Sequence, residues 1–211
     1  YQQNGGPLLY FGGYSTEGVD LCAEFCDVYL MWPDTEEKLK VLISKMKFKA
    51  ANYNRTVQFG LRVHVIVRET ENEAKAYANK LISKLDLKIG EDIKNRALDS
   101  KSLGVSKQTS LREKADKEYY TEPHLWTGIG LARSGCGAAI VGNPEQVFNK
   151  IKSYIDMGIN AFILSGYPHH QECELFAKYV LPKLKNVRLP EVLGRVPKKT
   201  PDTPLGNGPR E

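Results

Sequence analysis

The sequence lacks any regular arrangement of cysteines. Its four cysteines include no Cys-x-x-Cys, and Cys22 and Cys26 have the spacing of one buried helical face. Zinc sites and disulfide frameworks both depend on characteristic cysteine spacings, which this chain does not have. We therefore expect free thiols, no metal site and a reducing location, the cytoplasm.

Long apolar runs and strongly basic stretches are also missing. No apolar run approaches the roughly 20 residues of a membrane span, and no charged-then-apolar leader opens the chain. The net charge of +5 comes largely from lysines within residues 38–49, which alternate with apolar residues as on a solvated amphipathic helix. We expect neither a membrane nor a nucleic acid as partner. Because the chain opens on Tyr1 rather than Met, we expect an excerpt, a processed product or an incomplete gene.

Short strands alternate with helices along the chain, as is typical of an α/β fold with a parallel sheet. The hydrophobic content of 41% is that of a globular protein. Strands are predicted at residues 8–13, 27–32, 60–68, 138–141 and 161–164. Helices are predicted to begin after N-caps at Ser15, Asp34, Thr70 and Asn143, the last three as capping boxes, and a fifth over residues 171–184.

Two segments do not follow this alternation. Residues 86–121 have weak periodicity and are far longer than an ordinary connection, so they form either a functional lid or a disordered insertion. Residues 187–211 are rich in proline and are predicted to form a tail without a core.

The strand at residues 60–68 carries an unusual pair of side chains. Alternation places Arg62 and His64 on one side of this strand and five apolar residues on the other: Phe59, Leu61, Val63, Val65 and Val67. A buried guanidinium costs several kcal/mol unless an anion or dense hydrogen bonding meets it. The strand therefore either borders an anion-binding cavity or contains an internal ion pair.

Two glycine-rich segments suit anionic ligands, although each has a simpler interpretation. Residues 10–15 combine a strand end, two glycines and the capping Ser15, which suits a phosphate or simply forms a tight turn. Residues 128–137 hold Arg133, which either meets an anion or is merely exposed.

Two further features lie at strand ends. Trp32 either belongs to the core or flanks a planar ligand. Residues 165–170 read as a turn, and the adjacent His169 and His170 are poorly placed to chelate one metal.

Taken together, these motifs resemble one family over about residues 7–186. The matching segments are Tyr10-Phe-Gly-Gly, Gly60-Leu-Arg-Val-His-Val-Ile-Val-Arg-Glu-Thr70, Leu125-Trp, Gly130-Leu-Ala-Arg133, Val141-Gly and Phe162-Ile-Leu-Ser-Gly-Tyr-Pro-His169. In this order they are similar to the C-terminal part of FMNH2-dependent alkanesulfonate monooxygenases, which belong to the bacterial-luciferase-like flavin enzymes.

The resemblance implies a TIM (β/α)8 barrel, of which residues 1–186 supply about the last five strands and residues 86–121 a mobile insertion. It implies desulfonation of alkanesulfonates to aldehyde and sulfite with O2 and reduced FMN, which an NAD(P)H-dependent FMN reductase delivers. It also implies a homo-oligomer or a complementing N-terminal half. The alternatives are a related enzyme acting on another sulfur compound, such as a sulfone, and a non-catalytic or split half-barrel.

The resemblance also assigns site residues. The positions near substrate and flavin, expected to be catalytic, are Arg62, His64, Arg133 and Tyr167. The expected flavin-binding positions are Gly13, Ser15 and Trp32. Two arginines suit a sulfonate, a permanent anion, whereas an uncharged sulfone would not need them.

Overall fold

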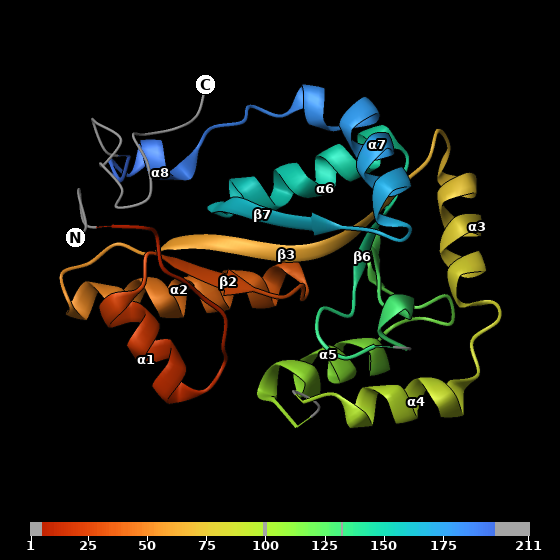
Figure 1. Cartoon of the computed structure of the whole chain (residues 1–211), viewed down its shortest axis with the longest axis horizontal. Helices are drawn as coiled ribbons and strands as arrows, with labels where there is room; N and C mark the ends of the chain where they lie inside the picture. The colour runs from red at the N-terminus through yellow and green to blue at the C-terminus, as the bar shows by residue number, and fades with distance from the viewer. Residues whose placement is uncertain (1–5, 99–100, 132, 197–211) are drawn as a thin grey trace, which may run out of the picture.

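The computed structural model describes residues 6–98, 101–131 and 133–196, which form one curled sheet with helices around it (Figure 1). Five of its strands are parallel: β1 (Tyr10–Phe11), β2 (Val28–Met31), β3 (Gln58–Val67), β6 (Ala139–Gly142) and β7 (Ile159–Ser165). Two short antiparallel strands, β4 (Tyr120–Glu122) and β5 (Leu125–Trp126), extend the sheet beyond β6. All five predicted parallel strands are confirmed, although β1 has only two residues.

The long strand β3 is the centre of the sheet. β2 pairs with its first residues and β6 with its last, from His64 to Val67. β7 pairs with β3 between Phe59 and His64, and in Figure 1 it lies on the side of β3 opposite to β2. A sequentially wound barrel would place β7 beside β6. The five strands are therefore those of a half-barrel, but their order differs from that of a closed one.

Local capping explains where most helices begin. The helices are α1 (Thr16–Phe25), α2 (Glu36–Asn52), α3 (Glu71–Ile82), α6 (Pro144–Asp156) and α7 (His169–Tyr179). The predicted caps at Ser15, Thr70 and Asn143 are confirmed, the last two as complete capping boxes. The predicted box at Asp34 is wrong, because its carboxylate accepts hydrogen bonds from the Lys38 ammonium and the Thr35 N–H, both at 2.9 Å. α7 begins two residues earlier than expected and ends at Tyr179.

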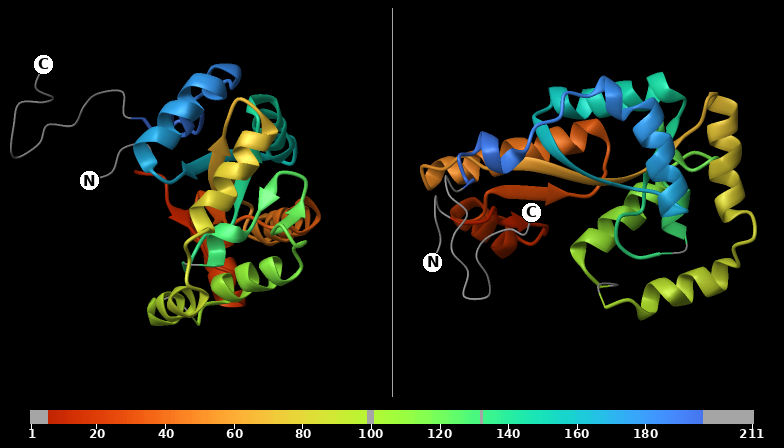
Figure 2. Two further views of the ribbon diagram at one scale, coloured as in Figure 1. Left: turned by 90° about the vertical axis from the view of Figure 1, so that its right-hand side faces the viewer. Right: turned by 45° about the horizontal axis from the view of Figure 1, so that its top comes forward.

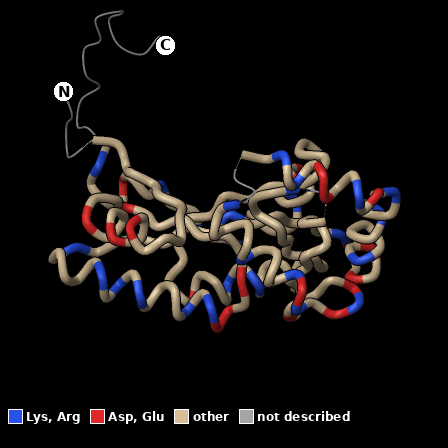
Figure 3. The backbone as a smooth tube through the Cα atoms, turned by 90° about the horizontal axis from the view of Figure 1, so that it is seen from below, with Lys and Arg blue, Asp and Glu red and all other residues tan. Residues whose placement is uncertain are grey.

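The main core lies between the sheet and the helices α2 and α6, which lie on the same side of β3 in the right-hand view of Figure 2. The β3 side chains predicted to share one face all belong to this core: Phe59, Leu61, Val63, Val65 and Val67. Leu39, Ile43 and Met46 of α2 are buried in it, and the lysines of this helix lie spaced along the opposite, solvent-facing side (Figure 3). The other face of β3, with Arg62 and His64, is left for the site.

The segment 86–121 has regular structure in its described residues, so the disordered insertion, one of its two expected alternatives, is not supported there. It contains α4 (Leu87–Arg96), α5 (Leu103–Glu113) and β4. In Figure 1 these two helices lie below the end at which β2 and β3 finish. α5 contacts the 3-10 helix η1 (Gly128–Leu131), the start of the glycine-rich loop. The insertion therefore lies next to the loop that carries Arg133.

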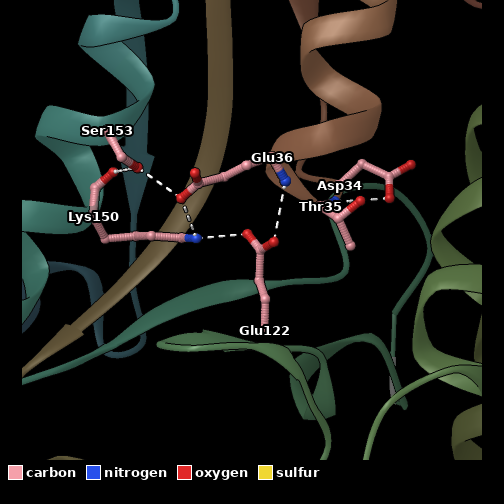
Figure 4. A network of polar contacts seen from close by, with 6 residues as sticks. All are labelled: Asp34, Thr35, Glu36, Glu122, Lys150 and Ser153. Carbon is pink, nitrogen blue, oxygen red and sulfur yellow. Dashed lines mark hydrogen bonds and ion pairs between the residues drawn. The ribbon is translucent and has the colours of Figure 1, made fainter.

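A partly buried ion-pair network joins the end of this insertion to two helices of the main core (Figure 4). The Lys150 ammonium on α6 contacts Glu36 of α2 at 2.9 Å and Glu122 of β4 at 2.5 Å. Glu36 also accepts a hydrogen bond from Ser153, and its N–H donates to Glu122. The Lys150 side chain is only 7% exposed. Through these bonds α2, α6 and β4 are held together.

Beyond α7, a 3-10 helix (Leu181–Lys183) and the short helix α8 (Leu189–Val192) complete the described chain. A tail without a core is expected from residue 187, and none of residues 187–196 is buried, while Arg195 forms an ion pair with Asp27 at 2.8 Å. The rest of that expected tail, residues 197–211, lies outside the described residues. None of the helices in the described ranges has the length and hydrophobicity needed to cross a membrane.

Candidate functional site

The site is built around His64, which is 1% exposed on the inner face of β3. Its Nε2 lies 3.1 Å from Nη1 of Arg133, and its Nδ1 lies 2.8 Å from the Ser165 hydroxyl. Because a guanidinium only donates hydrogen bonds, Nε2 must accept and the ring proton is assigned to Nδ1. Burial, with the charges of Arg133 and Arg62, lowers the pKa of His64 to about 4. The imidazole is therefore neutral at physiological pH.

Arg133 connects this histidine to the end of β7. Its Nη1 also donates to the Tyr167 hydroxyl at 2.5 Å, and its Nε donates to the carbonyl of Ser134 at 3.2 Å. The Tyr167 and His64 rings lie with their centroids 5.5 Å apart. Arg133 thus forms one cluster with Tyr167, which is 34 residues away in the sequence, and with His64, which is 69 residues away.

Arg62 lies on the same face of β3 as His64, half-buried and close enough to act on it electrostatically. In the described parts of the chain, neither Arg62 nor Arg133 forms an ion pair with a carboxylate. The arginines that do are Arg55, Arg68, Arg96, Arg188 and Arg195. Of the two alternatives for the β3 arginine, the internal ion pair is therefore not found, and two guanidiniums face the site without an anion.

Cys136 and Ser165 belong to the site but were not singled out from the sequence. The fully buried Cys136 thiol donates to the carbonyl of Arg62 at 3.2 Å, and burial raises its pKa to about 11, so it stays protonated. Ser165 fixes the His64 ring, as described above. Cys136 lies in the glycine-rich loop and Ser165 in the turn after β7, two motifs that were selected because of other residues. Membership of these motifs is the only feature of the sequence that points to Cys136 and Ser165.

A cavity of about 430 Å³ lies at the ends of β1 and β2. Its wall on the strand side is formed by Gly12, Gly13, Tyr14, Ser15, Leu30 and Trp32, and its wall on the insertion side by Ser102, Leu103 and Gly104. The Tyr14 hydroxyl accepts a hydrogen bond from the Trp32 N–H at 2.8 Å. Burial raises the pKa of Tyr14 to about 12, so the phenol is neutral. Tyr14 is a further residue that sequence reasoning did not single out.

These residues fit the planar ring of a flavin. Trp32 and Tyr14 supply aromatic surface, and the backbone at Gly12 and Gly13 borders the cavity without side chains. The Ser15 hydroxyl accepts from the Gly18 N–H as the cap of α1, so the tight turn with a capping serine is confirmed. The structure thus gathers all three expected flavin-binding residues, Gly13, Ser15 and Trp32, around one cavity.

The cavity adjoins the arginine cluster. A Cβ atom placed on Gly135, whose φ is +87°, would lie 3.8 Å from the Trp32 ring and 3.7 Å from Nη2 of Arg133. Trp32 and Arg133 therefore both lie close to Gly135, so the cavity is adjacent to the cluster of Arg133, Tyr167 and His64. Within residues 6–98, 101–131 and 133–196, no three His, Cys, Asp or Glu side chains are placed to hold a metal.

Two curated relatives are similar to this chain over most of its length. The sulfoquinovose monooxygenase of Agrobacterium fabrum (strain C58) is 58% identical over 210 residues, which cover 100% of this chain and 54% of that protein. The sulfoquinovose monooxygenase of Novosphingobium aromaticivorans is 57% identical over 180 residues, 85% of this chain and 50% of its own length. The chain spans about half the length of these relatives. Neither is named for alkanesulfonates, so they do not support the expected restriction to that substrate class.

Among solved structures, EDTA monooxygenase from Chelativorans sp. BNC1 has a similar fold, with a TM-score of 0.65 and 16% identity over 92% of this chain and 50% of that one. The sequence model of the luciferase-like monooxygenases matches residues 1–161. The chain therefore belongs to the luciferase-like monooxygenase family.

Proposed function

We propose that this chain is the sulfonate-binding part of a reduced-FMN-dependent monooxygenase that releases sulfite, with sulfoquinovose as its substrate. The observation that carries the proposal is the pair Arg62 and Arg133, whose charges both act on the neutral His64 and which form no ion pair with a carboxylate among the described residues. A sulfonate is a permanent anion with three acceptor oxygens, which two guanidiniums can bind through charge-assisted hydrogen bonds.

The names of the two relatives favour sulfoquinovose over a simple alkanesulfonate. Sulfoquinovose is a glucose derivative that carries a sulfonate on carbon 6, so it keeps the anion that the arginines suit. An uncharged sulfone would leave both guanidiniums without a counter-charge in a partly buried site. The proposal therefore keeps the expected sulfite release and changes the carbon skeleton of the substrate.

Each residue of the cluster has a role that follows from its hydrogen bonds. Arg133 uses Nε and Nη1 within the protein, which leaves the N–H groups of Nη2 to bind sulfonate oxygens. Tyr167 accepts a hydrogen bond from Arg133, so its own hydroxyl proton is available to an oxygen of the departing sulfite. His64, neutral and fixed by Ser165, holds Arg133 in place without adding charge.

The cavity lined by Gly12, Gly13, Tyr14, Ser15 and Trp32 would hold the flavin. Reduced FMN, when bound, supplies the electrons that activate O2, and a separate flavin reductase would regenerate it. The insertion residues Ser102, Leu103 and Gly104 line one side of this cavity and would help to exclude water from the reaction. Because the chain spans about half of its relatives, we propose that the remaining strands close a (β/α)8 barrel.

Substrate preference is tested by sulfite release from the full-length protein that carries this chain. The assay contains an FMN reductase, NADH and O2, with sulfoquinovose or octanesulfonate as substrate. We expect sulfite from sulfoquinovose and little from octanesulfonate. Equal turnover of octanesulfonate would contradict the sugar preference, and no sulfite from any sulfonate would contradict the proposed function.

The role of Arg133 is tested in the same assay. Replacing Arg133 by Ala removes the charge and the fork of donors, so we expect kcat/KM to fall by about 100-fold or more, since hydrogen bonds to charged groups contribute roughly 1.5–3 kcal/mol each. Arg133→Lys keeps the charge and should lie between Arg133→Ala and the wild type. Arg188→Ala, at a side chain that is 83% exposed, is the matched control. Near-normal turnover of Arg133→Ala would contradict the assignment.

A further inference from the structure

One face of α5 is directed at the two segments that form the site. Gly104, Gln108, Leu111 and Arg112 follow a spacing of four, three and one residues, so they lie along one stripe of the helix. Gln108 is 6% exposed and Leu111 is 1% exposed. A buried glutamine in the middle of this stripe must satisfy its amide group within the protein.

Gln108 does so by joining two backbone segments. Its Nε2 donates to the carbonyl of Pro33 at 2.7 Å, and its Oε1 accepts from the N–H of Gly137 at 3.0 Å. Pro33 directly follows Trp32, and Gly137 directly follows Cys136 in the loop that carries Arg133. One side chain thus connects the wall of the cavity to the loop of the arginine cluster.

The chemistry of the two partners explains why this residue is an amide. The Pro33 carbonyl can only accept a hydrogen bond and the Gly137 N–H can only donate one, so the orientation of the Gln108 amide is fixed. A carboxylate could accept from Gly137 but would repel the Pro33 carbonyl. An ammonium could donate to Pro33 but could not accept from Gly137.

Two neighbours on the same stripe reach the same two segments. A Cβ atom on Gly104 would lie 2.8 Å from the Trp32 ring, so the indole packs directly against the helix backbone. Arg112 donates from Nη1 to the carbonyl of Gly130 at 3.0 Å, within the glycine-rich loop. α5 therefore contacts the segment at Trp32 and the glycine-rich loop through Gly104, Gln108 and Arg112.

We infer that Gln108 is a positioning residue, which fixes the glycine-rich loop and Arg133 relative to Trp32 and so pre-organises the sulfonate site. Its effect on turnover rests on the proposed function, but its effect on the loop does not. The insertion would then contribute to substrate binding through this amide, in addition to lining the cavity.

Hydrogen exchange of the full-length protein tests the inference without any substrate. Gln108→Met keeps the side-chain volume and removes both hydrogen bonds. Gln146→Met is the matched control, because the Gln146 amide also makes two hydrogen bonds, to the Asn143 N–H at 2.8 Å and to Glu71 at 2.6 Å, away from this loop. We expect amides of residues 128–137 to exchange about tenfold faster in Gln108→Met only, as loss of two net hydrogen bonds allows. Unchanged exchange there, or the same increase in the control, would overturn the inference.

Steady-state kinetics supply the second readout. In Gln108→Met we expect the KM for sulfoquinovose to rise about tenfold with kcat changed less than about twofold, because binding rather than chemistry loses its pre-organisation. If the exchange result holds and the wild type releases no sulfite, the proposed function fails and the positioning role stands. A fall in kcat with unchanged KM would contradict the role in binding.

Gln108→Glu keeps the inference testable if Gln108→Met does not fold. The carboxylate retains the acceptor for Gly137 but donates to Pro33 only when it is protonated, and burial should raise its pKa. We expect its defect in KM, relative to the wild type, to shrink between about pH 8 and about pH 6. A defect that is the same across this range would contradict the assigned hydrogen bond to Pro33.

Discussion

The surroundings of His64 determine its charge. Desolvation and the nearby guanidiniums of Arg133 and Arg62 lower the pKa of His64 from 6.5 to about 4. The folded protein therefore binds fewer protons than the unfolded chain between these two values, and its stability must fall as the pH falls through this range. Above about pH 6.5 the full contribution is present.

When the pH is lowered from about 7.5 to about 5, we expect His64 alone to reduce the free energy of unfolding by about 2 kcal/mol. The measurement is urea denaturation of the wild type and of His64→Gln at both pH values. Glutamine is chosen because it cannot titrate but can still accept a hydrogen bond from Arg133. The variant should lose less stability than the wild type on acidification. His170→Gln, at a side chain that is 88% exposed, is the control and should follow the wild type. Parallel losses in all three proteins would show that His64 is not held neutral by its surroundings.

At the level of single residues, the sequence predicted side-chain direction but not partners. Strand alternation placed Arg62 and His64 together on one face correctly, because side chains in a strand alternate strictly. No pattern could pair His64 with Ser165, 101 residues away, or Cys136 with the carbonyl of Arg62. The resemblance to alkanesulfonate monooxygenases brought Arg133 and Tyr167 into the expected site, where spacing alone left Arg133 ambiguous.

Among the elements, those with local signals were predicted best. The capping boxes at Thr70 and Asn143 form as expected because all their donors and acceptors lie within four residues. The helices of the insertion were missed because their buried sides carry little hydrophobic signal. α4 buries only Gly90, and α5 buries Gly104 and Gln108 beside Leu111. A helix that packs through glycine and an amide has no apolar stripe to detect.

The network around Lys150 is the element-scale contact that most directly fixes the insertion. Removing its ammonium would leave Glu36 and Glu122 close together without a counter-charge. Burial raises the pKa of the Glu36 carboxyl, but hydrogen bonds from Lys150 and Ser153 outweigh this and lower it overall. The stabilisation from Glu36 is therefore present at neutral pH and is lost on acidification below its unfolded value of 4.5.

We expect Lys150→Met to lower the free energy of unfolding by about 2–4 kcal/mol at neutral pH, less than for a fully buried pair because Glu36 is 33% exposed. Urea denaturation measures this difference. Lys152→Met is the matched control on the same helix, since Lys152 pairs with Asp156 at side chains that are 54% and 60% exposed. The control should lose no more than about 0.5 kcal/mol. Equal losses in the two variants would mean that the network does not hold β4 to the core.

At the scale of the whole molecule, the order of the strands depends on how much of the barrel is present. In this chain β7 pairs with β3 from Phe59 to His64. In a closed barrel each strand pairs with its neighbours in sequence. β7 would then pair with β6, and β3 would pair with β2 on one edge and with β6 on the other. Since the chain spans about half of its relatives, we expect the β3–β7 pairing in the 211-residue chain and its replacement in the full-length protein.

Cross-linking distinguishes the two arrangements. Gln58→Cys and Asn160→Cys place thiols on β3 and β7 at side chains that share a hydrogen bond in this chain, in a Cys173→Ser background that removes the exposed native thiol. A short bis-maleimide should join them readily in the 211-residue chain and poorly in the full-length protein. Asp20→Cys with Lys49→Cys, at the ion pair between α1 and α2, should cross-link in both and serves as the control. Efficient β3–β7 cross-linking in the full-length protein would mean that the barrel does not close in sequence order, and that the site on β3 keeps the strand neighbours that it has in this chain.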